Sequence, residues 1–389
     1  MPVKKVAFII GSDLWMGGVN YFRNLFEAVR ALPDPEIDLV IFTGTKSDCH
    51  GLDKYAGVVR TPLLEKNTLS WVVRQVCKKV LGNRDYFLVS LLKRHNISLL
   101  SHSSRLWKGC GIATIVWIPD FQHLHLPEFF PRVEIQNRNK SYRFFCRNID
   151  IVLLSSRHAQ NDLKDFYNKA SRQSRVLPFM SCPGISQDKF SAFDELCEKF
   201  RLNRRWFYLP NQFWKHKNHR VVFEAVHELK KQGEDVLLVC TGSIHDYRNP
   251  GYYEELMERV RHDGILDSIM VLGDIPYVDV LSLMFHSIAV INPSLFEGWS
   301  STVEEAKSLG KRILLSDIEV HQEQAPERGY FFDPFDFHRL AGLMKTMAVS
   351  YDSAEELKCT AHAQAALPER QRKFAEQYQD IVLEACSYY

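Results

Sequence analysis

Short apolar runs of four to six residues alternate with longer amphipathic segments along most of the chain. The longer segments repeat apolar residues every three or four positions, which is the period of a helix, whereas the short runs are typical of buried strands. Regular alternation of strand and helix predicts parallel sheets with helices on both faces. The expected strands form two series of five, first Val6–Ile10, Asp38–Phe42, Ile97–Leu100, Ala113–Ile118 and Ile149–Leu154, then Trp206–Leu209, Val236–Cys240, Ile269–Leu272, Ile288–Ile291 and Arg312–Leu315.

The helical segments between these runs include Val19–Leu32, Ala159–Phe166, His219–Gln232, Tyr252–His262, Val303–Leu309 and Arg370–Cys386. Two such series predict an α/β chain made of two Rossmann-like, doubly wound domains. We expect the first domain at residues 1–180 and the second at 205–369, joined by a linker at 181–204 that holds Pro183 and Gly184. Ligands of these domains bind at the carboxyl ends of the strands, so motifs directly after a strand matter most.

Length and composition agree with this organisation and exclude other classes. The chain has 389 residues, 46% hydrophobic and 25% charged, which is typical of globular rather than disordered or fibrous proteins. No apolar run reaches the roughly 18 residues of a membrane span. The run Val6–Ile10 is too short for a secretory signal. The nine cysteines are scattered without a Cys-x-x-Cys pair, which favours reduced thiols and a cytoplasmic location.

The net charge of +2 hides an asymmetry between the two halves of the chain. Residues 1–190 carry 27 Lys and Arg against 16 Asp and Glu, whereas the remainder carries 22 against 31. The basic excess peaks between Arg60 and Lys108, where ten basic residues stand beside two acidic ones among aromatic and aliphatic residues. Such a surface suits an anionic membrane or a polyanionic, lipid-linked substrate. An ordinary solvated helix face is the alternative.

The segment Pro293–Gly310 has the strongest functional pattern. It lies between two expected strands and holds Glu297, then Gly298 and, eight residues after Glu297, Glu305 on an expected helix. The start of that helix offers free N–H groups and a positive dipole end, which suit a diphosphate. Carboxylates beside such a site accept hydrogen bonds from sugar and ribose hydroxyls.

Part of this pattern has a purely structural alternative. Ser301-x-x-Glu304 and Thr302-x-x-Glu305 both fit a capping box, in which the Glu only closes the start of the helix. Capping does not account for Glu297 and the glycine after it.

With Glu-x7-Glu after a strand, Gly after the first Glu and a Leu-Gly end, the segment resembles the retaining glycosyltransferases of GT-B fold, the glycosyl transferases group one family. The resemblance covers nearly the whole chain and implies two Rossmann-like domains facing a central cleft, with a last helix at 370–389 that packs back on the first domain. For the donor, it implies sugar contacts from Glu297, Gly298, Trp299 and Ser300, diphosphate contacts from Ser301 and Thr302, and a nucleoside contact from Glu305.

A second match is the pair Gly17-Gly18, which follows the first expected strand and opens a helix. Glycines at such a position let the backbone approach a phosphate closely, although a Gly-Gly pair alone is usually only a turn. The pattern is not Gly-x-Gly-x-x-Gly, so a nicotinamide or flavin dinucleotide site is poorly supported. In the family, this turn faces the donor diphosphate.

A third match, Lys215-His-Lys217, follows the first strand of the second half. A lysine at a strand-to-helix turn is a natural counter-charge for a leaving diphosphate, and the resemblance assigns this catalytic role to Lys217. Where the family has an Arg, this chain has Asn211, so either Lys215 supplies the second charge or the site is electrostatically weaker. Solvated surface lysines are the alternative.

A fourth match follows the strand Ala113–Ile118. Many relatives have a catalytic His-Asp pair where this chain has Pro119-Asp120, which makes Asp120 or His123 the candidate substitute. His123 and His125 are spaced like metal ligands, but the sequence shows no third ligand. A pair of histidines making local hydrogen bonds at a helix start is the alternative.

A fifth match, Gly273, Asp274 and Ile275, follows another strand of the second half and corresponds to the turn that holds the nucleoside in relatives. No Asp-x-Asp pair occurs, so the metal signature of the other major glycosyltransferase fold is missing. We therefore expect neither a metal nor another cofactor.

The resemblance thus implies a retaining glycosyltransferase, which we expect to be metal-independent and to lie in the cytoplasm or at the inner face of the cytoplasmic membrane. Its expected partners are a nucleotide-diphosphate sugar, a glycan or lipid-linked glycan acceptor of surface polysaccharide synthesis, and an anionic membrane surface, with no nucleic acid. A nucleotide-sugar epimerase or hydrolase of the same fold is one alternative. A degenerate sugar-nucleotide-binding partner protein is another.

Overall fold

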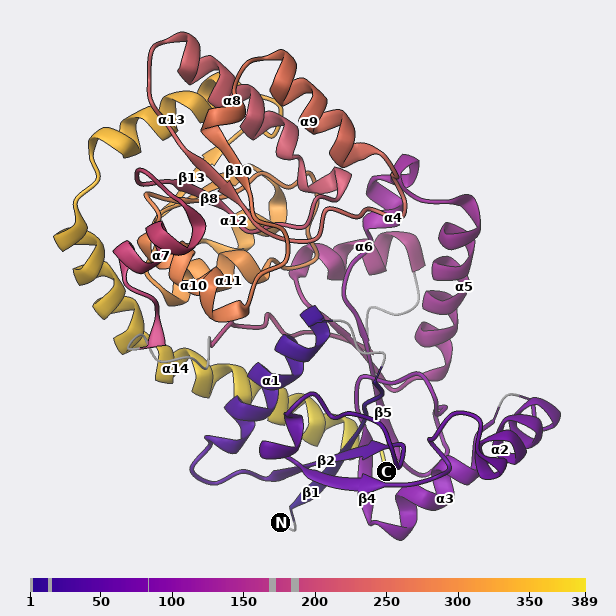
Figure 1. Ribbon diagram of the computed structural model, residues 1–389. Coiled ribbons are helices and arrows are strands. Elements are labelled where there is room, and N and C mark those ends of the chain that lie inside the picture. The colour runs from indigo at the N-terminus through magenta and orange to yellow at the C-terminus, as the bar shows by residue number, and fades with distance from the viewer. Residues whose placement is uncertain (1–2, 13–15, 83, 168–172, 183–188) are drawn as a thin grey trace. The chain divides into compact units, whose positions relative to one another are not determined.

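The computed structural model describes residues 3–12, 16–82, 84–167, 173–182 and 189–389 (Figure 1). The chain divides into two compact units, each assembled from segments that are far apart in the sequence. The first unit comprises Met1–Phe121, Gln136–Met180 and Glu369–Tyr389, and the second comprises Gln122–Ile135 and Ser181–Pro368. Pro183 and Gly184 of the expected linker lie outside the described residues.

The first unit is built on a parallel sheet of seven strands in the order β3-β2-β1-β4-β5-β6-β7. Its central strands are apolar and buried on both faces, as parallel strands covered by helices must be. The order reverses between β1 and β4, which defines the switch point of the unit. The strands are β1 Lys4–Ile9, β2 Ile37–Thr43, β3 Gly57–Arg60, β4 Ile97–Leu100, β5 Ala113–Ile118, β6 Ile151–Leu154 and β7 Ser174–Val176.

The second unit has a parallel sheet of six strands in the order β10-β9-β8-β11-β12-β13. Successive residues of a strand serve opposite faces, so Phe207 and Leu209 join one core while Tyr208 joins the other. Helices α8, α9 and α13 cover the first face, and α7, α10 and α11 cover the second (Figure 1). The strands are β8 Phe207–Leu209, β9 Leu238–Cys240, β10 Ile269–Val271, β11 Val290–Asn292, β12 Ile313–Ser316 and β13 Gly329–Phe332.

The helices lie between the strands as the alternating pattern predicts. Helix α1 begins three residues before the predicted Val19, so Gly17 and Gly18 form its first turn. Among the residues that the structure describes, no helix is both long enough and apolar enough to cross a membrane. The helices are α1 Met16–Arg30, α2 Leu69–Val80, α3 Tyr86–Arg94, α4 Gln122–His125, α5 Arg132–Asn148, α6 Arg157–Tyr167, α7 Phe193–Phe200, α8 His219–Lys231, α9 Tyr252–His262, α10 Tyr277–His286, α11 Ser301–Ser308, α12 Glu319–Gln324, α13 Phe337–Val349 and α14 Ser353–Cys386.

All ten predicted strands are present, but three further strands were not predicted. These strands, β3, β7 and β13, lie at the edges of their sheets. Each is short and partly exposed, so it lacks the continuous apolar run that marks a central strand. The two sheets are therefore wider than the sequence predicted.

Helix α14 is longer than the predicted Arg370–Cys386 and contains Pro368 in its interior. Its last turns belong to the first unit, where Tyr378 is fully buried and donates a hydrogen bond to Ser101 (2.8 Å). In the same unit, the Gln379 side chain accepts a hydrogen bond from the backbone N–H of Glu36 (2.8 Å). The end of α14 is thus part of the core of the first unit.

A buried ionic cluster fixes the start of α14 to the sheet of the second unit. Glu356 accepts hydrogen bonds from Lys311 (2.8 Å) and Arg328 (2.6 Å), and lies 3.1 Å from Nε of Arg312. Burial lowers the pKa of Lys311 to about 8 despite its partner Glu356. Burial alone would raise the pKa of Glu356, but its cationic partners outweigh that effect and lower it.

We expect Glu356→Gln to destabilise the second unit by about 3 kcal/mol, because Lys311 would remain buried without a counter-charge. The midpoint of thermal unfolding, followed by circular dichroism, should fall by roughly 5–10 °C. Glu355→Gln, at the exposed neighbouring position, is the matched control and should leave the midpoint unchanged. Equal midpoints for the two variants would show that the cluster is not stabilising.

Candidate functional site

The predicted site residues of the second half gather where the order of the second sheet reverses. Strands β8 and β11 are neighbours, while the chain continues from β8 to β9 on one side and from β11 to β12 on the other. Loops that leave the carboxyl ends of two such strands separate and leave a crevice, which is the usual ligand site of a doubly wound sheet. The loops are residues 210–218 after β8 and residues 293–300 after β11.

Two hydrogen bonds join these loops. The N–H of Leu295 donates to the carbonyl of His216 (2.8 Å), and the side chain of Asn218 donates to the carbonyl of Pro293 (3.1 Å). Asn218 has φ of +54° and precedes α8, so it ends the first loop in the left-handed conformation that Asn tolerates. The backbone around Lys217 is therefore held against the loop that carries Glu297.

Lys217 and Glu297 form an ion pair between these two loops, with 2.6 Å between Nζ and Oε1. The hydroxyl of Ser294 donates to the same oxygen (2.7 Å). Burial alone would raise the pKa of Glu297, but Lys217 and, more weakly, His321 and His216 lower it, so the carboxylate is ionised at neutral pH. The structure thus brings together a buried carboxylate and an ammonium that sequence analysis assigned to one site.

Asn211 stands where the family resemblance places an arginine, and its side chain is buried. Its amide donates to Asn292 (3.2 Å), and its oxygen accepts from the hydroxyl of Thr302 (3.4 Å). The amide of Asn292 in turn donates to Ser300 (2.7 Å). Asn211 therefore joins the loop after β8 to the end of β11 and to the first turn of α11 through hydrogen bonds, and it contributes no charge.

Lys215 is exposed, and its position differs from that of Lys217. Its ammonium lies over the ring of Phe129, 5.4 Å from the centroid, and its backbone N–H donates to Asp246 (3.1 Å). A cation over an aromatic face is weakly held, so this side chain can turn to another partner at small cost.

The start of α11 is capped by Ser300, whose hydroxyl accepts from the N–H of Val303 (3.4 Å). This differs from both predicted capping boxes, which began at Ser301 or Thr302. The side chain of Gln324, on α12, fixes the backbone of this capping residue. It accepts a hydrogen bond from the N–H of Ser300 (3.1 Å) and donates one to the carbonyl of Ser300 (3.0 Å). Ser301 and Thr302 fall in the first turn, where N–H groups lack partners within the helix.

Glu305 lies one turn further along α11, with its carboxylate buried. Burial raises its pKa to about 7, although a hydrogen bond from the hydroxyl of Tyr277 (2.8 Å) opposes the rise. Tyr277 begins α10, four residues after Gly273, which has φ of +68°. The predicted nucleoside residues Glu305 and Gly273–Ile275 are therefore neighbours of one tyrosine that sequence analysis missed.

Arg248 is a second residue that sequence analysis missed. Its guanidinium, 6% exposed, lies 3.2 Å from Glu134 and donates to Gln122 (3.3 Å). It also lies over the rings of Phe130 (4.1 Å) and Trp214 (4.9 Å). It thereby holds the segment Gln122–Ile135 against the loop that carries Lys217, and no local pattern in the sequence marks it.

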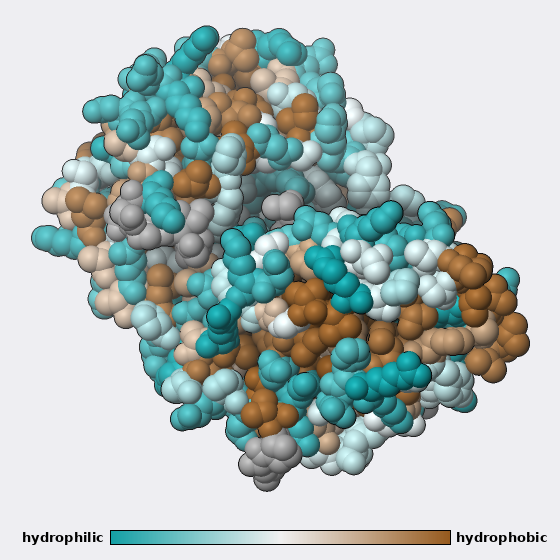
Figure 2. Space-filling view, turned by 60° about the horizontal axis from the view of Figure 1, so that its bottom comes forward, coloured by the Kyte–Doolittle hydropathy of each residue, from teal (hydrophilic) through white to brown (hydrophobic). Residues whose placement is uncertain are grey.

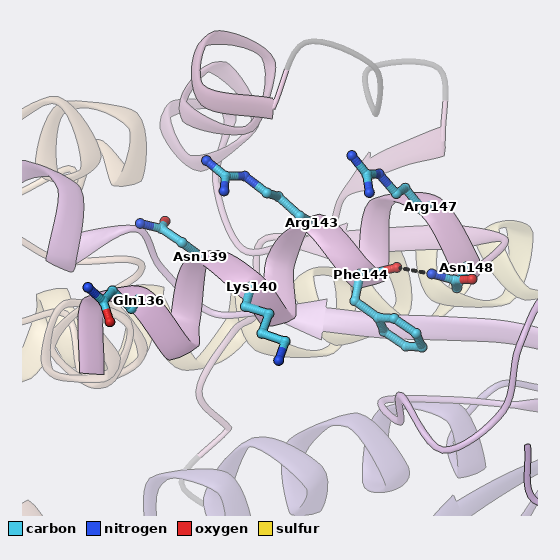
Figure 3. A pocket seen from close by; sticks show the side chains of 7 residues that line it. All are labelled: Gln136, Asn139, Lys140, Arg143, Phe144, Arg147 and Asn148. Carbon is cyan, nitrogen blue, oxygen red and sulfur yellow. Dashed lines mark hydrogen bonds between the residues drawn. The ribbon is translucent and has the colours of Figure 1, made fainter. Parts of the chain in front are cut away.

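A hollow along α5 is unrelated to these residues. It is lined by polar, cationic and aromatic side chains of that single helix, which point away from its axis in Figure 3: Gln136, Asn139, Lys140, Arg143, Phe144, Arg147 and Asn148. None of the predicted site residues lines it.

The comparison with protein families decides what kind of domain carries this site. Residues 198–363, which include both loops, α11 and the ion pair, match the model of the family described as glycosyl transferases group 1. These residues form a group 1 glycosyltransferase domain. No curated protein matches the chain significantly.

Solved structures resemble the chain over nearly its full length. They include a glycosyltransferase from Rickettsia africae (TM-score 0.70, 15% identity, 98% of each chain covered). Anabaena Alr3699/HepE in complex with UDP and glucose has a TM-score of 0.69 at 14% identity, covering 97% of this chain and 98% of its own. A lipopolysaccharide outer core galactosyltransferase, WaaB, has a TM-score of 0.61 at 15% identity, covering 98% and 99%. These likenesses confirm the predicted GT-B fold.

Three residues that the resemblance assigned to the donor or to catalysis lie outside the glycosyltransferase domain, in the first unit. Gly17 and Gly18 form the first turn of α1, directly after β1 at the switch point of that unit. Asp120 follows β5, and its carboxylate lies 3.5 Å from Arg138, while its carbonyl accepts from Tyr142 (3.3 Å).

His123 belongs to the second unit, together with the glycosyltransferase domain. Its ring is fully buried and meets Phe130 edge-on at 6.3 Å, so it presents no surface to a ligand in this structure. The ring of His125 lies 5.0 Å from that of Phe296, the residue before Glu297.

We expect Glu305→Gln to stabilise the protein at pH 8 but not at pH 5. Because the pKa of Glu305 is about 7 in the folded protein and lower in the unfolded chain, the folded state binds the extra proton. The stabilising effect of this proton on the folded state is present at low pH and is lost as the pH rises through 7. Glutamine mimics the protonated carboxyl group, so the free energy of unfolding should rise by roughly 1–3 kcal/mol at pH 8.

Urea unfolding of both proteins at the two pH values measures this difference. Glu327→Gln, at an exposed position in the same domain, should follow the natural protein at both. A gain of the same size at pH 5 and pH 8 would contradict the raised pKa of Glu305.

Proposed function

We propose that the protein is a retaining, metal-independent glycosyltransferase. It transfers a sugar from a nucleotide-diphosphate donor to a hydroxyl of a glycan or glycolipid acceptor, and it acts in the cytoplasm in the synthesis of a surface polysaccharide. The observation that carries the proposal is the Lys217–Glu297 ion pair at the switch point of a group 1 glycosyltransferase domain. The Anabaena structures with UDP and glucose support a nucleotide-sugar donor.

Lys217 stabilises the leaving diphosphate in this proposal. As the bond between the anomeric carbon and the phosphate oxygen breaks, negative charge grows on the diphosphate, and a fixed ammonium lowers the energy of that state. The first-turn N–H groups of α11, at Ser301 and Thr302, add the positive end of the helix dipole. An ammonium has three N–H donors, so Lys217 can bind a phosphate while it keeps Glu297.

Glu297 binds the hydroxyls of the donor sugar. Its ionised carboxylate has acceptor positions beyond the bonds to Lys217 and Ser294, and the following residues Gly298–Ser300 bring backbone groups to the sugar. Glu305 and the turn at Gly273 bind the ribose and the base.

Retention follows if the acceptor hydroxyl attacks from the side of the leaving group. The acceptor oxygen forms a bond to the anomeric carbon, the diphosphate leaves with the bonding electrons, and the acceptor proton passes to a phosphate oxygen. This route balances charge and needs no covalent intermediate with the protein.

We expect Lys217→Ala to lower the rate of transfer at least 100-fold and to reduce the thermal stabilisation by UDP, because the charge opposite the diphosphate is lost. Glu297→Gln should lower the rate by a similar factor but keep the stabilisation by UDP, because the nucleotide carries no sugar. Lys231→Ala, on an exposed position of the same domain, is the control for charge and should behave as the natural protein.

These variants separate the proposed reaction from its alternatives. UDP, GDP, dTDP and ADP are tested in turn, and the failure of all four to stabilise the protein would favour a degenerate partner protein. Consumption of the donor without transfer to any acceptor would favour a hydrolase or an epimerase. Full activity of both variants would show that the site lies elsewhere.

Metal independence gives a separate expectation. EDTA should leave both the stabilisation by the nucleotide and the initial rate unchanged, because Lys217 and α11 supply the positive charge in place of a cation. A loss of rate that Mg²⁺ or Mn²⁺ restores would contradict the proposal.

A further inference from the structure

Helix α2 of the first unit turns its apolar side to solvent. Its exposed aliphatic residues are separated by three, one, three and four positions, so they share one side of the helix. We call them the α2 face: Leu69 (81% exposed), Val72 (44%), Val73 (43%), Val76 (58%) and Val80 (78%). Figure 2 shows apolar surface gathered on the part of the molecule that carries this helix.

The opposite side of α2 is attached to the protein by charge. Arg74 is 2% exposed, and its guanidinium donates two hydrogen bonds to Asp85 (2.9 and 2.6 Å) and one to the carbonyl of Leu63 (2.8 Å). Asp85 is itself buried and caps α3 through the N–H of Leu88 (3.1 Å). A surface helix of a globular protein normally does the reverse, with apolar residues inward and charges outward.

The charges around the α2 face are positive. Lys66, Lys79 and Arg84 are exposed on α2 or directly beside its ends. Between Arg60 and Lys108 the sequence has only two acidic residues, Glu65 and Asp85. Asp85 is buried against Arg74, and Glu65 accepts from the N–H of Lys46 (2.8 Å). The border of the face therefore attracts an anionic partner.

We propose that the α2 face inserts into the surface of an anionic lipid bilayer, with the neighbouring lysines and arginine on the lipid headgroups. A helix with one aliphatic side and basic residues beside it is the usual form of an interfacial membrane helix. A protein partner is less well matched, because the face has no aromatic residue or hydrogen-bonding group of the kind that protein interfaces concentrate at their centre. The biological role of this contact rests on the proposed function, because binding to the membrane would bring the enzyme to a lipid-linked acceptor.

The test is flotation of the full chain with vesicles of phosphatidylcholine, with and without phosphatidylglycerol. The natural protein should float only with the anionic vesicles and should be released by salt. The double variant Val72→Ser, Val76→Ser should bind them at least ten-fold more weakly. The double variant Lys66→Gln, Lys79→Gln should bind more weakly and with a smaller salt dependence.

Val133→Ser is the matched control, because Val133 is also an exposed valine (67%) but lies on α5. It should bind vesicles as the natural protein does. All the substituted side chains of the serine variants are exposed, so the midpoints of thermal unfolding should agree among them.

Three results would overturn the inference. They are no flotation of the natural protein, equal binding to neutral and anionic vesicles, and unchanged binding of the Val72/Val76 double variant. Self-association in solution that this variant abolishes, without flotation, would instead assign the face to a protein partner.

The stabilisation by UDP is measured on the same samples. Vesicle binding without any effect of nucleotides would refute the proposed function and leave the α2 inference standing. Stabilisation by UDP without vesicle binding would refute the α2 inference and leave the proposed function standing.

Discussion

The ion pair between Lys217 and Glu297 is the interaction on which the candidate site depends. Burial alone raises the pKa of Glu297, and a protonated carboxyl group would have fewer acceptor positions for a ligand. The 2.6 Å contact with Lys217 keeps it ionised. The loops after β8 and β11, which carry these two residues, are joined by the hydrogen bond between Leu295 and His216 where the order of the sheet reverses.

Two carboxylates eight residues apart on the same segment consequently have opposite properties. Glu297 has an ammonium partner and a lowered pKa, whereas Glu305 accepts a hydrogen bond from the neutral hydroxyl of Tyr277 and has a pKa raised to about 7. The ionised carboxylate of Glu297 can stabilise a group that gains positive charge, or it can accept several hydrogen bonds. The second is suited to a neutral partner, such as a pair of ribose hydroxyls, at a position where a second fixed negative charge would repel a diphosphate.

The sequence predicts what is local and fails where structure depends on distant residues. The central strands were predicted because burial on both faces leaves a continuous apolar run, while the edge strands β3, β7 and β13 have no such run. Lys217 and Glu297 could be found because each lies in a short motif after a strand. Arg248 and Gln324 could not, because each acts on residues that are distant in the sequence and has no neighbour that marks its role. Ser300 shows the limit of motifs, since the two predicted capping boxes began at Ser301 and Thr302, whereas the helix is capped by Ser300.

Helix α2 shows the same limit in another form. An amphipathic pattern predicts that a helix has an apolar and a polar side, but it does not show which side packs against the protein. The apolar side is usually the buried one. In α2, the orientation of the helix depends on Arg74, which lies on the side opposite the valines. Arg74 forms a buried ion pair with Asp85, eleven positions later. Separating the buried Arg74 from Asp85 would leave two uncompensated buried charges, at a cost of about 3–5 kcal/mol. The ion pair therefore holds the apolar side outward, and the proposed membrane contact is what would recover the free energy that solvent exposure of those valines forgoes.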